Sequence, residues 1–362
     1  MKEFVIVGSG PASINCAWSI YRSEPRRPIR IVTRDPFVFS KMVVPSVLKT
    51  LKNISQFSPS LPPSALVEYG QEIAGIDVDR MIIFSRCREW NYEKLFIGIG
   101  SRQKLIPFSG RRIFYPSRVG DMIELRNLIQ EGIKRVVIYG FGMVTLELVD
   151  ILVGLNIVPV IIFSSPYPLS RIVNRDIGDY LASNFSGFIE LYASSEISEL
   201  SDRHIVTTAG VRIPYEALIV AKGSQENEIQ GFELGVNEFF ETAYPGIFAG
   251  GDAVKVFDIV DGVEKYMHLH SVAWECGYYA GLNMLGARLP FRGTLFRAIT
   301  KTKRFSITIV GNLKEFDDME VKCKDGEKMF YCMKKGKLSG FFGYGFNVGI
   351  KNILREFLRV YC

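Results

Sequence analysis

Two glycine pairs, each at the end of an apolar run, are the residues whose spacing best suits them to hold phosphate groups. Residues 4–7 predict a buried strand that leads through Gly8 and Gly10 into a helix predicted over residues 11–22. Gly8 permits a tight turn, and Gly10 lets the backbone approach a pyrophosphate at the positive N-terminus of the helix. Ser13 stands at the third small position, where glycine is usual. A single motif of this kind also occurs in ordinary strand-to-helix turns, so it does not by itself establish nucleotide binding.

The same pattern recurs later in the chain. The apolar residues 136–139 are followed by Gly140 and Gly142, and then by a predicted helix with Thr145 at the third small position. A further glycine-containing segment, residues 244–252, ends in Gly-Gly-Asp. Two nucleotide-type loops followed by a late Gly-Asp pair are far more specific than any one of them alone.

In this order the motifs resemble the FAD-dependent pyridine nucleotide-disulfide oxidoreductase family, the flavoproteins with two dinucleotide-binding domains. The resemblance covers nearly the whole chain and is nearest to the branch of NADH oxidases, rubredoxin reductases and nitrite reductase-like proteins. Residues 91–102 are similar to the stretch that ends the family's first FAD segment, with Ile99 where threonine is usual. Residues 273–286 resemble the family helix whose N-terminus faces the flavin pyrimidine ring.

The resemblance implies an α/β protein with two doubly wound Rossmann-like nucleotide-binding domains and a small α+β C-terminal domain. The length of 362 residues accommodates two or three domains. Residues 51–70 are polar and contain several prolines, so they predict a surface loop with a short helix. The predicted division is 1–107 for the first FAD-binding segment, 108–222 for the NAD(P)-binding domain, 223–290 for the second FAD-binding segment and 291–362 for the C-terminal domain.

Two cofactors, FAD and a nicotinamide dinucleotide, are implied. By the resemblance Asp252 binds the ribityl chain of FAD, because carboxylate oxygens accept hydrogen bonds from hydroxyl groups. Thr33 replaces the acid that usually binds the adenosine ribose, so Asp35 could substitute only if the loop bends back. The predicted cofactor-binding residues are Gly8, Gly10, Pro11, Ala12, Ser13, Thr33, Arg34, Ser40, Lys41, Gly100, Ser101, Arg102, Gly140, Gly142, Met143, Val144, Thr145, Glu147, Ser164, Gly223, Gly251 and Asp252.

Lys41 is predicted as a catalytic residue. It lies in residues 37–45, which resemble the family segment that passes beside the flavin, where a cation would favour the anionic reduced form. A solvated surface lysine is the alternative. The disulfide-reducing branches of the family place a redox cysteine close to this segment, but this chain has no cysteine between Cys16 and Cys87. We therefore expect electrons to leave the reduced flavin directly for an outside acceptor.

Glu147 is the second predicted catalytic residue. In the family a glutamate at this place lies near the nicotinamide and the flavin and helps to orient the rings for hydride transfer, which depends mainly on positioning. A glutamate on an exposed helix face is the alternative. The next predicted strand, residues 158–163, ends in Ser164 rather than an acid, with Arg171 and Arg175 downstream. This pattern favours NADPH weakly, and NADH stays open.

The formal net charge of +6 is concentrated at one end of the chain. Residues 291–362 contain 15 Lys and Arg against seven Asp and Glu, whereas the rest of the chain contains 29 against 31. This excess is either a lysine-rich solvated surface or a landing surface for an acidic partner, whose approach such a field would accelerate. Residues 350–360 predict a helix whose apolar face docks onto its own domain, with membrane contact as the less favoured alternative.

Other classes of protein and site are disfavoured. No apolar run reaches the roughly 18 residues of a membrane span, and the start of the chain lacks a signal segment, so a cytoplasmic protein is expected. His268 and His270 have no further ligand at metal-site spacing, so no metal is expected. No nucleic-acid partner is expected either. Cys323 and Cys332 flank a turn and could face each other on a hairpin, although cytosolic thiols usually stay reduced.

The predicted function is that of an FAD-dependent NAD(P)H oxidoreductase. Reduced nicotinamide would pass a hydride to flavin N5, and the flavin would then release electrons to a small acidic iron-sulfur protein of the rubredoxin or ferredoxin type. An NAD(P)H oxidase that reduces oxygen is one alternative, and a homodimer is compatible with either. A flavin-binding subunit without catalysis is another, since the chain departs from the family pattern at Ser13, Thr33, Ile99, Thr145 and Lys222.

Overall fold

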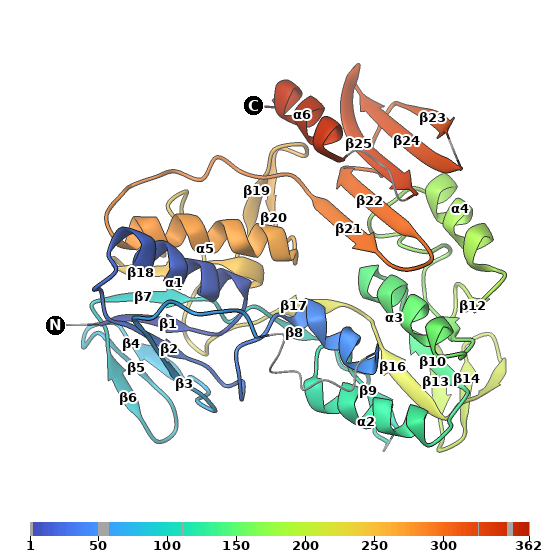
Figure 1. Ribbon diagram of the computed structural model, residues 1–362, viewed down its shortest axis with the longest axis horizontal. Helices are drawn as coiled ribbons and strands as arrows, with labels where there is room; N and C mark the ends of the chain where they lie inside the picture. Colours follow the sequence, from blue (N-terminus) through green and yellow to red (C-terminus); the bar gives the residue numbers. More distant parts are fainter. Residues whose placement is uncertain (1–2, 50–57, 111, 325, 346–349, 362) are drawn as a thin grey trace. The chain divides into compact units, whose positions relative to one another are not determined.

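The computed structural model describes residues 3–49, 58–110, 112–324, 326–345 and 350–361. The chain forms two compact units, and each is built from segments that are distant in the sequence. The first unit consists of Met1–Val43, Asn53–Arg102 and Ser224–Thr294. The second unit consists of Val44–Lys52, Gln103–Gly223 and Leu295–Cys362 (Figure 1).

The first unit contains a parallel sheet of five strands in the order β18-β7-β1-β2-β3. Its central strand β1 is buried at every position, as expected of an apolar strand covered on both faces. The sheet thus confirms the doubly wound arrangement predicted for the N-terminal segment. Its strands are β1 (Phe4–Val7), β2 (Ile29–Val32), β3 (Ala65–Glu68), β7 (Lys94–Ile97) and β18 (Ile247–Ala249).

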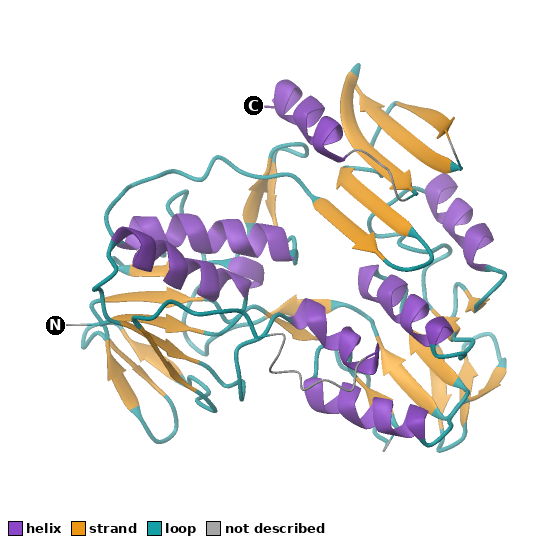
Figure 2. Cartoon of the chain, in the orientation of Figure 1, coloured by secondary structure: helices purple, strands orange, loops and turns teal. Residues whose placement is uncertain are grey.

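Helices α1 (Pro11–Ser23) and α5 (His270–Met284) lie side by side over this sheet (Figure 2). They approach closely because α5 presents glycine to α1. A Cβ on Gly277 would lie 2.0 Å from the main-chain oxygen of Ala12, and one on Gly281 would lie 2.7 Å from that of Cys16. No larger residue fits at these contacts without moving a helix.

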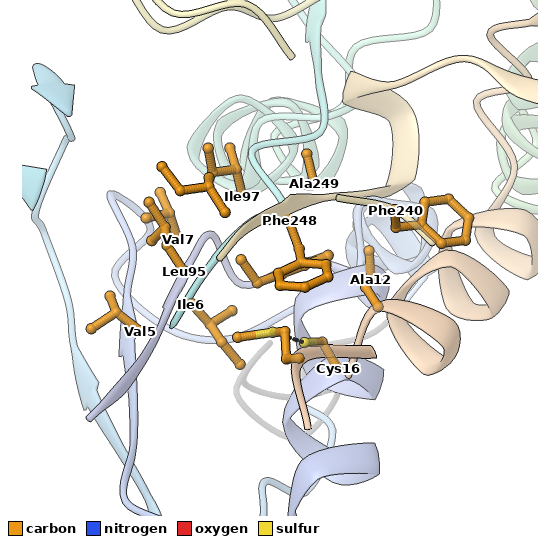
Figure 3. Close-up of a cluster of buried hydrophobic side chains, with 14 of the residues drawn as sticks. Val5, Ile6, Val7, Ala12, Cys16, Leu95, Ile97, Phe240, Phe248 and Ala249 are labelled. Atoms are coloured by element: carbon orange, nitrogen blue, oxygen red, sulfur yellow. Dashed lines mark hydrogen bonds between the residues drawn. The ribbon is translucent and has the colours of Figure 1, made fainter. Parts of the chain in front are cut away.

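The core of the first unit lies between the sheet and this helix pair. Phe248 and Phe240 pack there with the side chains of β1 and β7, and Cys16 Sγ lies 3.6 Å from Met284 Sδ (Figure 3). Cys16 is fully buried and behaves as a small apolar residue. The core therefore holds the start of α1 firmly against the ends of the strands.

The prediction of a surface loop with a short helix for residues 51–70 was wrong in its last part. Residues 65–68 form strand β3, which pairs in parallel with β2 from Ile29↔Ala65 to Val32↔Glu68. This edge strand is only partly buried, and its apolar run, residues 65–67, is only three residues long. Its conformation comes from hydrogen bonds to β2, which the local sequence does not show. Residues 51–57 lie outside the described residues.

Smaller elements complete the first unit. An antiparallel sheet contains β4 (Gly75–Asp77), β5 (Ile82–Phe84) and β6 (Glu89–Asn91). A hairpin contains β19 (Val256–Asp258) and β20 (Val263–Lys265), preceded by the 3₁₀ turn η3 (Gly251–Ala253). Strands β8 (Ser101–Gln103) and β17 (Ser224–Glu226) pair where the chain passes between the units.

The second unit contains another parallel sheet of five strands, in the order β12-β11-β10-β16-β9. The repeated sheet confirms the prediction of a second Rossmann-like domain. Its strands are β9 (Ile113–Phe114), β10 (Val136–Tyr139), β11 (Val160–Ile162), β12 (Glu190–Tyr192) and β16 (Ala217–Val220). The accompanying elements are η1 (Lys41–Lys49), which begins in the first unit, α2 (Val119–Gln130), α3 (Met143–Gly154), α4 (Arg175–Phe185), β13 (Ile197–Leu200), β14 (His204–Thr207) and β15 (Arg212–Pro214).

The end of the second unit is an antiparallel sheet in the order β21-β22-β25-β24-β23, followed by α6 (Ile350–Tyr361). Phe357 of α6 is fully buried and would touch a Cβ placed on Gly311, which confirms that this helix docks onto its own domain. The strands are β21 (Arg297–Lys301), β22 (Ser306–Gly311), β23 (Asp318–Lys324), β24 (Glu327–Lys334) and β25 (Lys337–Tyr344).

Cys323 and Cys332 do not pair. Cys323 is exposed opposite Lys328, whereas Cys332 is buried opposite Met319, so the hairpin register places the two thiols at different rungs. Among the described residues, no helix has both the length and the apolar character that crossing a membrane requires.

Candidate cofactor sites

The first glycine turn joins β1 to α1. Gly8 has φ +101°, and a Cβ there would lie 2.3 Å from the main-chain oxygen of Gly98, so only glycine fits between the two strand ends. Gly10 is the N-cap of α1, and a Cβ on it would meet no atom within 4 Å. No N-cap side-chain hydrogen bond covers this helix start, and Pro11 follows at the first position. The amides of Ala12 and Ser13 thus suit an anion at the helix N-terminus.

An acid lies beside this turn although none ends strand β2. The loop after Thr33 bends back, and Ser9 Oγ donates a hydrogen bond of 2.8 Å to Asp35 Oδ2. Thr33 is buried and donates from Oγ1 to Ser9 Oγ at 3.2 Å. The condition under which Asp35 could replace the usual ribose-binding acid is therefore met. Ser9 is not among the predicted cofactor-binding residues, and its only signal in the sequence is its place between the two glycines.

Lys41, Ser101 and Asp252 form a hydrogen-bonded chain in the first unit. Lys41 Nζ donates to the main-chain oxygen of Ser101 at 2.6 Å, and Ser101 Oγ donates to Asp252 Oδ2 at 2.9 Å. A Cβ on Gly100, which has φ +64°, would lie 3.9 Å from Lys41 Nζ. Gly251 stands beside Ala12 at the start of α1, since a Cβ on it would lie 3.0 Å from Ala12 Cβ. Predicted residues from four separate segments thus meet.

The charges of Lys41 and Asp252 perturb each other's pKa. Lys41 keeps exposed surface, but burial around its amino group lowers its pKa, an effect that the charge of Asp252 partly opposes. Burial alone would raise the pKa of Asp252. Its interactions with His268, Ser101 and Lys41 outweigh that effect and hold the pKa below its ordinary value. Asp252 is therefore a carboxylate at neutral pH, able to accept hydrogen bonds from hydroxyl groups.

His268, considered from the sequence only as a metal ligand and rejected as one, lies beside Asp252. It has a left-handed backbone with φ +47°, and its Nδ1 lies 3.8 Å from Asp252 Oδ2. That Nδ1 atom is buried without a hydrogen-bond partner. His270 instead stacks on Trp274, with ring centroids 6.0 Å apart. The described residues contain no group of three ligands that could hold a metal ion.

Three other predicted residues of the first unit take no part in these contacts. Arg34 lies 3.7 Å from Glu72, and Arg102 lies 3.6 Å from Glu228; both arginines are exposed. Ser40 accepts a backbone hydrogen bond at the start of η1. The remaining groups suit the parts of FAD that need partners. The open start of α1 suits the pyrophosphate, the acid at the turn suits the ribose hydroxyls, and the buried carboxylate suits the ribityl hydroxyls.

The second glycine turn repeats the first. Gly140 has φ +116°, and a Cβ on it would lie 2.4 Å from the main-chain oxygen of Ala221. Gly142 is the N-cap of α3 and faces open space. Thr145 Oγ1 donates to Gly140 O at 2.9 Å and accepts from Gly142 N at 3.3 Å. These bonds leave the amides of Met143 and Val144 at the helix start for a second pyrophosphate.

Departures from the family pattern have structural explanations. Ser13 Oγ lies 3.5 Å from the main-chain oxygens of Val7 and Gly98, so its side chain fits between helix and strands. Lys222 Nζ donates to Tyr139 Oη at 2.9 Å and to a carboxylate oxygen of Glu196 at 3.1 Å. These substitutions preserve the glycine turns rather than disrupting them.

Glu147 lies in the second turn of α3 and is half-buried. Burial raises the pKa of its carboxyl group, and the positive charge of Lys49 opposes this rise. A glutamate in such surroundings holds its proton to a higher pH than an exposed one. The structure thus excludes the alternative of a freely solvated side chain at this position.

The residues considered for nucleotide preference lie at the ends of β11 and β16. Ser164 follows β11 and is exposed, and the Arg175 guanidinium lies 6.0 Å from the ring centre of Tyr167 in the same loop. Gly223, with φ +87°, follows β16, and a Cβ on it would lie 3.9 Å from Arg171 Nη1. Arg171 therefore lies beside the segment that follows β16, whereas Arg175 begins α4 and lies 3.4 Å from Asp179 Oδ2.

Residues 2–277 match the sequence profile of the family described as pyridine nucleotide-disulphide oxidoreductase. The NADH oxidase of Methanocaldococcus jannaschii is 24% identical over 327 residues, covering 82% of this chain and 73% of the relative. The ferredoxin–NAD(+) reductase component of the p-cumate 2,3-dioxygenase system of Pseudomonas putida is 26% identical over 276 residues, covering 70% of this chain and 67% of the relative. The structure of NADH:rubredoxin oxidoreductase from Clostridium acetobutylicum superposes with a TM-score of 0.80 at 19% identity. The superposition covers 100% of this chain and 96% of that structure. The chain therefore belongs to the pyridine nucleotide-disulphide oxidoreductase family and is an FAD-dependent NAD(P)H oxidoreductase.

Proposed function

We propose that this enzyme takes electrons from NAD(P)H and delivers them to a small acidic iron-sulfur protein of the rubredoxin or ferredoxin type. The observation that carries the proposal is the state of the cysteines. Burial raises the pKa of Cys16, and it raises the pKa of Cys276 and Cys332 to about 12, so these thiols stay protonated and inert. Cys87 and Cys323 are exposed and unpaired. Because these five described thiols form no reactive dithiol, the proposal passes the electrons to an acceptor outside the chain.

The residues of this chain have distinct parts in the reaction. The helix starts at Gly10 and Gly142 bind the two pyrophosphates, and Asp35 binds the adenosine ribose of FAD. Asp252 accepts a hydrogen bond from the ribityl chain, held in place by Ser101. Bound FAD supplies a ring that accepts a hydride and releases electrons singly. Glu147 orients the nicotinamide, since transfer depends on holding the donor carbon close to its acceptor.

Charge supports a protein acceptor. The segment from 291 to 362 carries eight more basic than acidic residues, and exposed lysines such as Lys324 and Lys351 belong to it. A positive surface attracts an acidic protein and speeds its encounter, and the attraction weakens as salt screens it. In the alternative function, an NAD(P)H oxidase, the acceptor is oxygen. Oxygen is uncharged, so salt should not change its rate of reaction. Salt therefore distinguishes the two acceptors.

The first experiment mixes the flavin-loaded protein anaerobically with NADH and, separately, with NADPH, and follows the loss of the visible absorbance of oxidised flavin. Rapid bleaching by one nucleotide identifies the donor. Glu147→Gln should slow bleaching without releasing FAD, because the side chain keeps its shape but loses its charge. An unchanged rate would remove Glu147 from the reaction.

The second experiment measures reoxidation of the reduced protein by oxygen, a rubredoxin and a ferredoxin at low and high salt. We expect fast reoxidation by one carrier at low salt, with a steep decline as salt rises, and slow, salt-independent reoxidation by oxygen. Fast reoxidation by oxygen alone would identify an oxidase. A protein that binds FAD but is bleached by neither nucleotide would identify a flavin-binding subunit without catalysis.

A further inference from the structure

Asp150 is a buried carboxylate that the proposed reaction does not use. It lies in α3 and is 1% exposed. Lys49 Nζ at the end of η1 is 3.0 Å from Asp150 Oδ2, and Arg304 Nη1 is 3.0 Å from Oδ1. Arg304 also donates to the main-chain oxygen of Asp150 at 3.1 Å. A carboxylate so deeply buried is stable only because both of its oxygens are paired with cations.

This cluster has an uncompensated charge. Asp150 contributes one negative charge, while Lys49 and Arg304 contribute two positive charges, so the three together carry one positive charge. Glu147 precedes Asp150 by three residues on α3, and residues with this spacing lie next to each other on one face of a helix. An ionised Glu147 would make the group of four neutral. The sequence spacing and the ion pairs thus place the surplus charge beside Glu147.

The two cations differ in their freedom to act on Glu147. Arg304 is held at two points of Asp150, its carboxylate and its main-chain oxygen. Lys49 has a single hydrogen bond to Asp150, its side chain is 42% exposed, and its charge already opposes the effect of burial on Glu147. Lys49 is therefore the cation that Asp150 and Glu147 share.

We propose that Lys49 and Asp150 are positioning residues that set the charge of Glu147, with Asp150 holding the ammonium group of Lys49 and limiting how strongly it attracts Glu147. This inference rests on the proposed part of Glu147 in nicotinamide binding. In the described structure Lys49 from η1 is the charged group that acts on Glu147. Lys49 in turn pairs with Asp150 of α3, whose other carboxylate oxygen accepts from Arg304 in the turn between β21 and β22.

The proposal predicts shifts of opposite sign from two substitutions. Lys49→Met removes the attracting cation, so the pKa of Glu147 should rise by about one unit or more. Asp150→Asn removes a neighbouring negative charge and frees Lys49 for Glu147, so the pKa of Glu147 should fall. Lys49→Arg should restore nearly the original value. A purely structural disturbance of α3 gives no reason for opposite signs.

The measurement is a carbon-13 NMR titration of the flavin-loaded protein with labelled glutamate carboxyl groups. The signal of Glu147 is the one that disappears in Glu147→Gln. Lys134→Met, an exposed lysine of the same unit, is the matched control and should leave the titration unchanged. Thermal unfolding checks that each variant folds. If Asp150→Asn does not fold, Lys49→Met and Lys49→Arg still test the proposal, because Lys49 is partly exposed.

The outcomes separate this inference from the proposed function. Unchanged titration in Lys49→Met, or shifts of the same sign in Lys49→Met and Asp150→Asn, would overturn the inference even if Glu147→Gln slows bleaching. Opposite shifts together with normal bleaching in Glu147→Gln would support the charge-setting pair and remove Glu147 from nicotinamide positioning. If the pKa of Glu147 shifts in opposite directions in the two variants, and the pH profile of bleaching moves with it in each, both the inference and the proposed function are supported.

Discussion

Asp35 Oδ2 accepts a hydrogen bond of 2.8 Å from Ser9 Oγ, which brings an acid from beyond β2 to the first glycine turn. In a dinucleotide fold this acid usually ends the second strand itself. Here Thr33 occupies that place, is buried, and supports Ser9 from the side. Asp35 lies two residues further along the chain, and the bend of the loop brings its carboxylate to the glycine turn.

Asp35→Ala should weaken FAD binding, because the acceptor for the adenosine ribose hydroxyls is lost. A hydrogen bond to a charged group contributes about 1.5–3 kcal/mol, which corresponds to an increase in Kd of roughly 10- to 100-fold. Titration of the apoprotein with FAD, followed by flavin fluorescence, measures this. Asp79→Ala, an exposed aspartate of the same unit, is the control. Equal affinities in the two variants would mean that the loop acid does not contact FAD.

Gly277→Ala should destabilise the first unit. The new Cβ would lie 2.0 Å from the main-chain oxygen of Ala12, so α1 and α5 must separate. Overpacking of this kind costs about 1–3 kcal/mol, and the displaced start of α1 should also bind FAD less tightly. Gly120→Ala, in α2 and facing open space, is the matched control and should leave the free energy of unfolding equal or slightly higher. Urea unfolding measures both variants.

Asp252→Asn should lower FAD occupancy and remove a pH-dependent contribution to stability. The folded-state pKa of Asp252 is depressed, so its carboxylate stabilises the fold above the ordinary value of 3.8. That stabilisation is lost as the pH falls through the depressed value. The difference in free energy of unfolding between the wild-type apoprotein and Asp252→Asn should therefore be largest near neutral pH and shrink below about pH 4. A difference that does not change between pH 7 and pH 3 would contradict the ionised state assigned to Asp252.

Arg175→Glu tests the weak preference for NADPH. The guanidinium lies beside Tyr167 in the loop after β11 and 3.4 Å from Asp179 Oδ2. We expect it to pair with a phosphate on the adenosine ribose when NADPH binds. We expect kcat/KM for NADPH to fall by about tenfold or more, and that for NADH to change little. Arg203→Glu, an exposed arginine of the same unit, provides the comparison. A parallel loss with both nucleotides would show that Arg175 does not read the 2′-phosphate.

Much of the fold could be predicted because its signals are local. The apolar runs before Gly8 and Gly140 predicted β1 and β10, and the helices that follow begin where the glycine spacing placed them. Strand β3 could not be predicted, because a half-exposed edge strand of four residues has no periodicity and owes its conformation to its partner. The sequence favoured unpaired thiols at Cys323 and Cys332, and the register of β23 against β24 gives the reason, because it places the two cysteines opposite different residues.

The sequence alone determined the two glycine turns, the carboxylate at Asp252 and the lack of a cysteine between Cys16 and Cys87, since backbone freedom, charge and residue type are properties of single positions. Only the tertiary structure decided that Asp35 reaches Ser9, that His268 stands beside Asp252, and that Lys49 and Arg304 pair with Asp150. Each of these contacts joins segments whose separation in the sequence carries no information about distance. They form because packing of the strands and helices brings the segments together, and buried charges then require partners.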